Sequence, residues 1–220
     1  MGIDKGKINP GSWHGTGNIS DKACVRGADT DDREEVEVRQ DHMRALDLFK
    51  QEFGYPEMVL YSGCGTDSTV TFAFQDAKQI FCVDPNDMYI STLKKYLKDT
   101  SHDLYAKIQF LNQGTETIPY DNFDLVVSIH SQAPFNAEFD KIKPGGYLFI
   151  CRKRSDYALD NSALRLLGVI VMTNSDEPQL ITDKLDDYYE IDPDAPEITF
   201  GNRRRLQAEF YIFRKADRAN

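Results

Sequence analysis

Residues 59–67, with the sequence VLYSGCGTD, decide the fold of this 220-residue chain. The run from Val59 to Tyr61 predicts a short buried strand, and the glycines that follow it predict a tight turn. Glycine adopts positive φ and lets the backbone approach a ligand closely, so Gly63 and Gly65 are typical of a nucleotide-binding turn. Because ligands gather at the carboxyl ends of parallel strands, we expect a cofactor at Ser62, Gly63 and Gly65.

Apolar runs and helical patterns alternate around this turn. Further strands are expected at residues 79–84, 105–111, 123–129 and 147–151, with a turn at 143–146 before the last of them. Helices are expected at residues 31–53, with a capping box at Asp31 and Glu34, and at 68–75 and 87–98. This alternation predicts an α/β fold, a doubly wound and mostly parallel sheet with helices on both faces.

The pattern is looser after Arg154. Residues 163–167 and 179–186 read as helices, and residues 169–172 read as a strand. Residues 206–215, LQAEFYIFRK, alternate as a long strand with no helix after it. We therefore expect this strand to be antiparallel and to form a hairpin with residues 188–191.

Composition restricts the partners and the compartment. The net charge of −10 would repel a phosphate backbone, which argues against a nucleic-acid partner. No apolar run reaches the ~20 residues of a membrane span, and the first residues have no signal-peptide core. The four cysteines contain no C-x-x-C pair, so no metal site is signalled, and a reducing, cytoplasmic location is expected.

Residues 1–30 are polar and aperiodic, which predicts a flexible N-terminal arm before one domain at 31–220.

Asp84 ends the second strand, about twenty residues after the glycine turn. At this spacing a carboxylate accepts both hydroxyls of an adenosine ribose. The alternative is a turn or cap aspartate, because Pro85 and Asn86 follow it. With Gly63 and Gly65 upstream, the ribose role is the favoured interpretation.

Polar residues also end the third and fourth strands. Gly114 and Thr115 follow the third strand, where they would meet an adenine edge, and Ser128 ends the fourth. His130 follows Ser128 and is the best-placed titratable group for general-base work near neutral pH. The alternative for His130 is a solvated loop histidine.

The chain resembles the class I (Rossmann-like) S-adenosylmethionine-dependent methyltransferases. The resemblance spans about residues 36–214 and rests on the order VLYSGCGTD, IFCVDP, TIPYDNFDLVVS, KIKPGGYLFI and EFYIFRK. It implies a seven-stranded sheet whose last strand is antiparallel. It also implies transfer of a methyl group from S-adenosyl-L-methionine to a small molecule or a protein group.

By the same resemblance, Ser62, Gly63 and Gly65 lie under the methionine and ribose of the cofactor, with Asp84 and Pro85 at the ribose. Gly114 and Thr115 lie at the adenine, and Ser128 lies near the methyl group. Three positions depart from the family pattern. Tyr61 replaces the acid that begins the family's glycine motif, Asp67 replaces its last glycine, and Gly114 stands where an aspartate is usual. Asp67 is a candidate to replace the lost acid from the other side of the turn.

Two other functions remain open from the sequence. The departures at Tyr61, Asp67 and Gly114 suit a non-catalytic binding or scaffold protein of the same fold. The glycine turn and Asp84 also suit a nicotinamide-dependent oxidoreductase, although Ser68 replaces the third glycine of its fingerprint.

Overall fold

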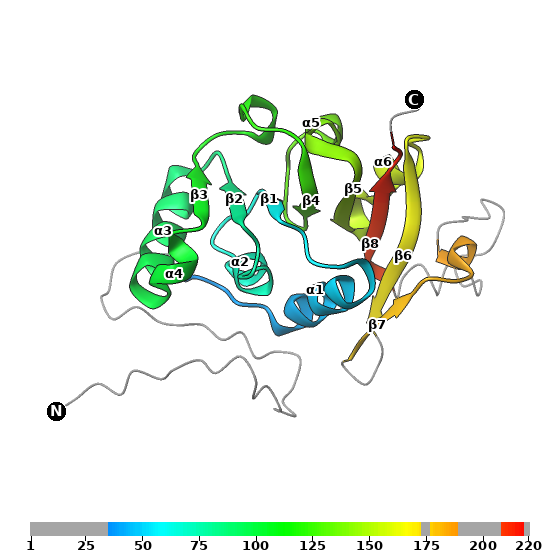
Figure 1. Ribbon diagram of the computed structural model, residues 1–220, viewed down its shortest axis with the longest axis horizontal. Coiled ribbons are helices and arrows are strands. Elements are labelled where there is room, and N and C mark those ends of the chain that lie inside the picture. The colour runs from blue at the N-terminus through cyan, green and yellow to red at the C-terminus, as the bar shows by residue number, and fades with distance from the viewer. Residues whose placement is uncertain (1–34, 173–176, 189–207, 218–220) are drawn as a thin grey trace.

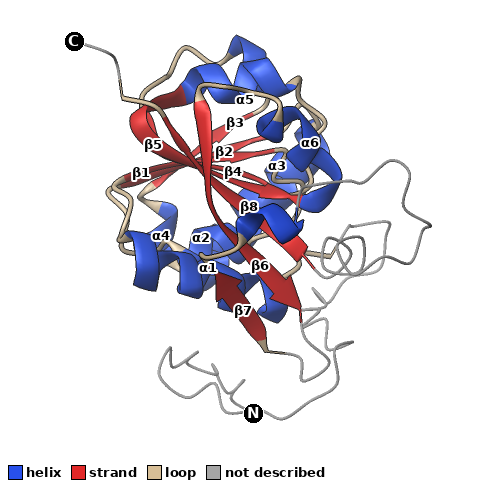
Figure 2. Cartoon of the chain, turned by 90° about the vertical axis from the view of Figure 1, so that its right-hand side faces the viewer, coloured by secondary structure: helices blue, strands red, loops and turns tan. Residues whose placement is uncertain are grey.

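The computed structural model describes residues 35–172, 177–188 and 208–217. Their strands form an eight-stranded sheet in the order β3-β2-β1-β4-β5-β8-β6-β7 (Figure 1). Helices lie on both faces of this sheet (Figure 2). The predicted α/β class, with a mostly parallel sheet, is confirmed.

Strands and helices alternate along most of the described chain. The strands are β1 (Met58–Ser62), β2 (Gln79–Val83), β3 (Ile108–Leu111), β4 (Phe123–Ser128), β5 (Ile142–Cys151), β6 (Leu164–Met172), β7 (Pro178–Ile181) and β8 (Ala208–Lys215). The α-helices are α1 (Gln40–Phe53), α2 (Thr69–Ala73), α3 (Asp87–Thr100), α4 (His102–Tyr105), α5 (Phe135–Lys141) and α6 (Arg152–Leu159). Two short 3-10 helices are η1 (Thr115–Thr117) and η2 (Leu185–Tyr188).

The parallel half of the sheet positions the site. Strand β1 pairs in parallel with β2 and β4, β2 with β3, and β4 with β5. Ser62 pairs with Val83, and Tyr61 pairs with Val127. The glycine turn, Asp84 and the loop after β4 therefore follow neighbouring strand ends at one edge of the sheet.

The antiparallel half is organised around β8, drawn in red in Figure 1. Strand β8 lies between β5 and β6 and is antiparallel to both, with Ile212 opposite Phe149 and Tyr211 opposite Val169. Its residues 210–213 are fully buried. Strand β7 then pairs antiparallel with β6 at the end of the sheet.

Each face of the sheet has its own hydrophobic core. Alternate residues of a strand point to opposite faces, so Val59 and Tyr61 lie on one face and Leu60 on the other. The first core contains buried residues of α1, α2, α3 and α4, and the second contains Ala158 of α6 and Tyr188 of η2.

The first two long helices each bury an apolar stripe. Leu46 and Phe49 are buried on α1, and Ile90, Leu93 and Leu97 are buried on α3. The side chain of Asn86 caps α3 by accepting the Met88 N–H at 3.0 Å. Helix α1 begins at Gln40, so its predicted start was too early. The capping box at Asp31 and Glu34 and the arm at 1–30 lie outside the described residues.

Two predicted helices are strands. Residues 163–167 belong largely to β6, and residues 179–186 comprise most of β7 followed by the beginning of η2. Both segments contain good helix formers, but their pairing with distant strands decides their conformation. The sheet therefore has eight strands where seven were expected.

Two further details differ from the sequence prediction. Strand β8 pairs with β5 and β6 instead of forming a hairpin with residues 188–191. Residues 143–146 are part of β5, not a turn before it, although the register against β4 shifts there. Gly145 accommodates this irregularity with a φ of 73°. Within the described residues, no helix has the length and apolar character needed to cross a bilayer.

Candidate functional site

The glycine turn keeps the backbone conformation expected of it. Gly63 has a φ of 63° and Gly65 a φ of 53°, a region that favours glycine. A Cβ on Gly63 would lie 2.5 Å from the Cα of Ser131, so this glycine allows the loop after β4 to pack against the turn. A Cβ on Gly65 would meet nothing within 4 Å. The open side of the turn is therefore at Gly65.

Two hydrogen bonds hold the Asp84 side chain next to the open side of the turn. One carboxylate oxygen accepts the Gly65 N–H at 3.0 Å, and the other accepts the Asn86 N–H at 2.9 Å. The residue is 8% exposed. Two carboxylate oxygens provide about four lone-pair sites, so acceptor capacity remains for two hydroxyl donors. Asp84 therefore fixes its own turn, which is one of the two roles considered from sequence, and it faces the glycine turn. Its ribose role stays a prediction.

Tyr61 and Asp67, two of the departures from the family pattern, interact with each other. The Tyr61 hydroxyl donates to Asp67 Oδ2 at 2.9 Å, and the Thr69 N–H donates to Asp67 Oδ1 at 2.8 Å. Both Tyr61 and Asp67 are buried. Burial raises the pKa of the Asp67 carboxyl, although its hydrogen-bond donors oppose this shift. Burial and the neighbouring Asp67 raise the pKa of Tyr61.

Two histidines and an arginine lie beside Asp67. His130 Nε2 is 3.8 Å from Asp67 Oδ2 and 3.1 Å from a guanidinium nitrogen of Arg39. His42 comes from α1, and its ring centroid is 5.7 Å from that of His130. Burial, and then Arg39, lower the pKa of His42 to about 4. Burial also lowers the pKa of His130, helped by Arg39 and opposed by Asp67. Both imidazoles are therefore neutral near pH 7.

Hydroxyl groups connect the ends of three strands beneath the turn. Ser62 Oγ shares hydrogen bonds with Thr115 Oγ1 at 2.7 Å and with Ser131 Oγ at 2.9 Å. Ser62 and Thr115 are buried, so their hydroxyls serve this network. Gly114 precedes Thr115 and is covered by the side chain of Glu116.

Ser128 belongs to a separate buried polar cluster. Its hydroxyl donates to the Glu138 carboxylate at 3.0 Å, and Arg154 forms an ion pair with the same carboxylate at 3.0 Å. Arg154 also donates to the carbonyl oxygens of Ser131 at 2.7 Å and Ala133 at 2.6 Å. Arg154 therefore fixes the loop that carries His130.

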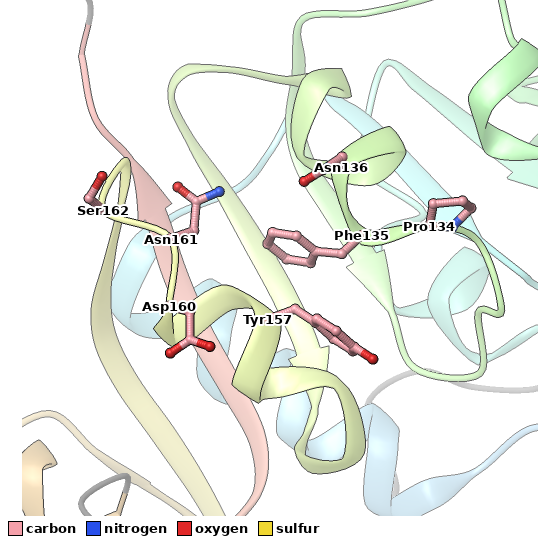
Figure 3. A pocket seen from close by; sticks show the side chains of 7 residues that line it. All are labelled: Pro134, Phe135, Asn136, Tyr157, Asp160, Asn161 and Ser162. Carbon is pink, nitrogen blue, oxygen red and sulfur yellow. The ribbon is translucent and has the colours of Figure 1, made fainter.

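Two surface hollows lie away from the glycine turn. One, of about 540 Å³, is lined by Pro134, Phe135, Asn136, Tyr157, Asp160, Asn161 and Ser162 (Figure 3). The rings of Phe135 and Tyr157 stack there with centroids 6.2 Å apart. The other, of about 470 Å³, lies between residues 48–52 of α1 and residues 178–182 around β7.

The structure brings most of the predicted site residues together. Ser62, Gly63, Gly65, Asp67 and Asp84 form one cluster with Thr115 and His130, whereas Ser128 faces Glu138 and Pro85 is exposed. Sequence reasoning missed four residues: Arg39 and His42 in the site, and Glu138 and Arg154 in the polar cluster that supports its loop. His42 had a detectable signal, because it lies at helical spacing from the buried Leu46 and Phe49. The other three are recognised only through long-range contacts.

The residues present fit an adenosyl group. Open space beside Gly65, its positive φ and the acceptor capacity of Asp84 are the features that such a group requires. At Gly63 the turn is covered by the Ser131 backbone, so the open approach is from the Gly65 side.

Known proteins support this interpretation. A family model described as a methyltransferase domain matches residues 60–150, from the glycine turn through β5. A methyltransferase from Geobacter sulfurreducens has a TM-score of 0.53 and 10% identity, covering 82% of this chain and 80% of that chain. The N-methyltransferase NodS from Bradyrhizobium japonicum WM9, in complex with S-adenosylhomocysteine, has a TM-score of 0.51 and 13% identity, covering 80% and 86%.

The crystal structure of the [4+2]-cyclase SpnF is also similar, with a TM-score of 0.52 and 15% identity over 80% of this chain and 82% of that chain. At these identities, structural likeness shows the shared fold alone. No curated protein sequence matches this chain.

The sheet order, the glycine turn and the matched family model together define a class I methyltransferase domain. Residues 60–150 therefore carry the methyltransferase domain that the motifs predicted. The family implies S-adenosylmethionine as co-substrate, and it favours methyl transfer over the hydride transfer considered from sequence.

Proposed function

We propose that this chain transfers a methyl group from S-adenosylmethionine to a small molecule or a protein group, with the adenosyl part held by Gly65 and Asp84. The observation that carries this proposal is the Asp84 carboxylate, hydrogen-bonded to the Gly65 N–H at 3.0 Å beside open space. A fixed carboxylate accepts two ribose hydroxyls without first losing side-chain entropy.

The remaining predicted residues have supporting roles in this proposal. Ser62 and Thr115 hold the strand ends in register through their shared hydrogen bond. Gly114 and Pro85 border the ribose and the adenine of the cofactor. Ser128 supports the loop after β4 through its hydrogen bond to Glu138. Asp67 takes the place of the acid that Tyr61 displaces and presents its carboxylate near the methionyl end.

When bound, the cofactor supplies a methyl carbon made electrophilic by its sulfonium. The chain must then align a nucleophile behind that carbon and exclude water. His130 is the residue that we assign to the acceptor side, because its side chain is 43% exposed at the rim of the turn. Its neutral imidazole offers a lone pair, which suits either proton removal or coordination of an ion.

Titration of the purified chain with S-adenosylhomocysteine by calorimetry tests the cofactor site. We expect Asp84→Asn to weaken binding at least tenfold, because hydrogen bonds to a charged group contribute ~1.5–3 kcal/mol. Asp87→Asn is the matched control, since Asp87 is an exposed aspartate at the start of α3, and it should bind like the parent. Thermal melts of both variants establish that they are folded.

A second variant tests the open side of the turn. Gly65→Ala places a methyl group in the open space beside Asp84 and should also weaken binding. Absence of heat at millimolar ligand with the parent, or unchanged affinity in a folded Asp84→Asn variant, would contradict the proposed site.

One observation favours a second candidate, a binding protein of this fold that does not catalyse transfer. The Tyr61 ring is fully buried where the family has an acid, so a cofactor contact is missing. Incubation with labelled S-adenosylmethionine and cell extract distinguishes the two candidates, because label in any acceptor establishes transfer.

We also propose a reducing compartment such as the cytoplasm. The supporting observation is that the described cysteines, Cys64, Cys82 and Cys151, are free thiols.

A further inference from the structure

We propose that His42, Asp67 and His130 bind a divalent transition-metal ion beside the glycine turn. The three residues come from α1, from the turn after β1 and from the loop after β4, and one ligand atom of each lies within 4.8 Å of the others. Two imidazoles and one carboxylate suit Zn²⁺, Fe²⁺ or Co²⁺. Three protein ligands leave coordination positions open for water or for an acceptor atom.

His42 carries an unpaired nitrogen, which this ion would satisfy. The residue is 3% exposed, and its Nδ1 has no hydrogen-bond partner among the described residues. A buried polar atom without a partner is rare and destabilising, so it calls for a compensating role. A neutral imidazole with a free lone pair is the form that binds metal ions.

Asp67 has the support expected of a metal-binding carboxylate. The Tyr61 hydroxyl donates to Asp67 Oδ2 at 2.9 Å and the Thr69 N–H donates to Oδ1 at 2.8 Å, which together fix the group. Hydrogen bonds to a ligand residue, such as these, orient that ligand in metal sites. Tyr61 and Asp67 are also the two departures from the family's glycine motif. The proposed site therefore accounts for both substitutions, one as a ligand and the other as its hydrogen-bond donor.

Arg39 is the main competitor of the ion. Its guanidinium lies 3.1 Å from His130 Nε2, so the two cations would compete for one lone pair. Acidic groups offset the positive charge of the ion. Asp41 Oδ2 is 3.9 Å from His42 Nε2, and the negative charge of Glu37 raises the pKa of His130. We infer that Arg39 and the ion exchange, with the arginine side chain turning outward when the ion binds.

The ligand atoms must move closer when the ion binds. With bonds of ~2.1 Å, ligand atoms of a tetrahedral zinc site lie about 3.4 Å apart. His130 is the ligand free to close this difference, because its side chain is 43% exposed whereas that of Asp67 is 7% exposed.

Binding of the ion does not depend on the proposed methyl transfer. Only its use rests on the proposed function: an ion at His130 would bind the acceptor and lower the pKa of its reacting group. Metal binding and S-adenosylhomocysteine binding are therefore measured separately, and either can fail alone.

Titration of the untagged, chelator-treated full chain with Co²⁺ tests the site through its visible absorption. We expect one equivalent to bind, Zn²⁺ to displace it, and His130→Ala and Asp67→Asn each to weaken binding at least tenfold. His102→Ala is the matched control, since His102 is an exposed histidine on α4, and it should leave binding unchanged.

Two further variants test the surroundings of the ion. Tyr61→Phe removes the hydrogen bond to Asp67 and should weaken Co²⁺ binding about 10–100-fold. Arg39→Gln removes the competing guanidinium and should strengthen binding. Thermal melts show which variants are folded. No binding by the parent or by Arg39→Gln, or equal binding by the parent and a folded His130→Ala variant, would overturn the proposal.

Discussion

Gly63 and Gly65 share a positive φ but have different surroundings. Gly63 lies against the backbone of Ser131, whereas Gly65 borders open space next to Asp84. The first glycine therefore serves the protein's own packing, and the second leaves room for a ligand. A side chain at either position is strained, but only at Gly63 does it also collide with the protein.

Gly63→Ala should therefore destabilise the fold more than Gly65→Ala. A left-handed conformation costs ~1–2 kcal/mol for a residue with a Cβ, and overpacking adds ~1–3 kcal/mol. We expect losses of about 3 kcal/mol for Gly63→Ala and about 1 kcal/mol for Gly65→Ala in urea unfolding. Equal losses would show that the contact with Ser131 is not tight.

Asp124 ties β4 to the beginning of β1. Its Oδ2 accepts the N–H groups of Met58 at 2.7 Å and Glu57 at 2.8 Å, and its Oδ1 pairs with Lys143. Burial alone would raise its pKa, but the Lys143 ammonium and the two N–H donors lower it below the usual value. The resulting stabilisation is present above the unfolded pKa of 3.8 and is lost as pH falls through the folded pKa.

The free energy of unfolding of the parent should thus fall on acidification below about pH 4. Asp124→Asn should be less stable at pH 6 and show a shallower fall. Asp99→Asn, at an exposed position of α3, is the control and should follow the parent. Chemical denaturation at several pH values measures these slopes, and parallel slopes for Asp124→Asn and the parent would contradict the linkage.

Individual residues of the site could be predicted from the sequence where they directly follow a strand. Asp84 could be predicted because a carboxylate after an apolar run has a known position in a parallel sheet. Arg154 could not, because its partners Glu138 and Ser131 are brought to it only by the packing of α6. The sequence therefore predicts residues at the strand ends better than residues that support them through long-range contacts.

Helix α6 contacts the loop at 131–133 through Arg154, which also forms a buried ion pair with Glu138 of α5. Glu138 on α5 is fully buried and Arg154 is 14% exposed, with 3.0 Å between their charged groups. Removing one member of such a pair leaves an uncompensated charge, whereas replacing both is much less costly.

Arg154→Met should destabilise the fold by about 3–5 kcal/mol. The double variant Glu138→Leu with Arg154→Met should lose less than the single variant, because no lone charge remains. In both, amide hydrogen exchange in the loop at 131–133 should accelerate, since its carbonyl contacts are lost. Lys153→Met, at an exposed neighbouring position, is the control. A double variant less stable than the single one would contradict this account.

Local patterns predicted those elements whose neighbours are close in sequence. The apolar run before the glycine turn was identified because parallel central strands need little else. The segment at 163–167 was assigned as a helix because leucine and alanine favour helices, yet it pairs with β8 about fifty residues later. Long-range pairing of this kind overrides propensity and is not encoded in a short window.

At the scale of the whole molecule, β8 joins the two halves of the sheet. It is the strand through which β5 connects to β6, and its residues 210–213 are buried by both cores. The predicted antiparallel strand was correct, but its position between two strands required the structure.

Removal of residues 208–220 should therefore abolish cooperative unfolding. Without β8, strand β5 has an open edge and β6 and β7 have no parallel half to join. Removal of residues 218–220 alone is the control and should leave the transition unchanged. Circular dichroism with heating distinguishes the outcomes, and a cooperative transition in the larger deletion would show that the parallel half folds alone.

The order of the strands along the chain also affects folding of the nascent chain during translation. The chain supplies β5 well before β8, with β6 and β7 between them. Until β8 emerges, the nascent sheet presents the unpaired edge of β5, and such edges are sites of misassembly between chains. A chaperone that shields this edge during translation should raise the yield of native protein, whereas slow synthesis of residues 152–207 should lower it.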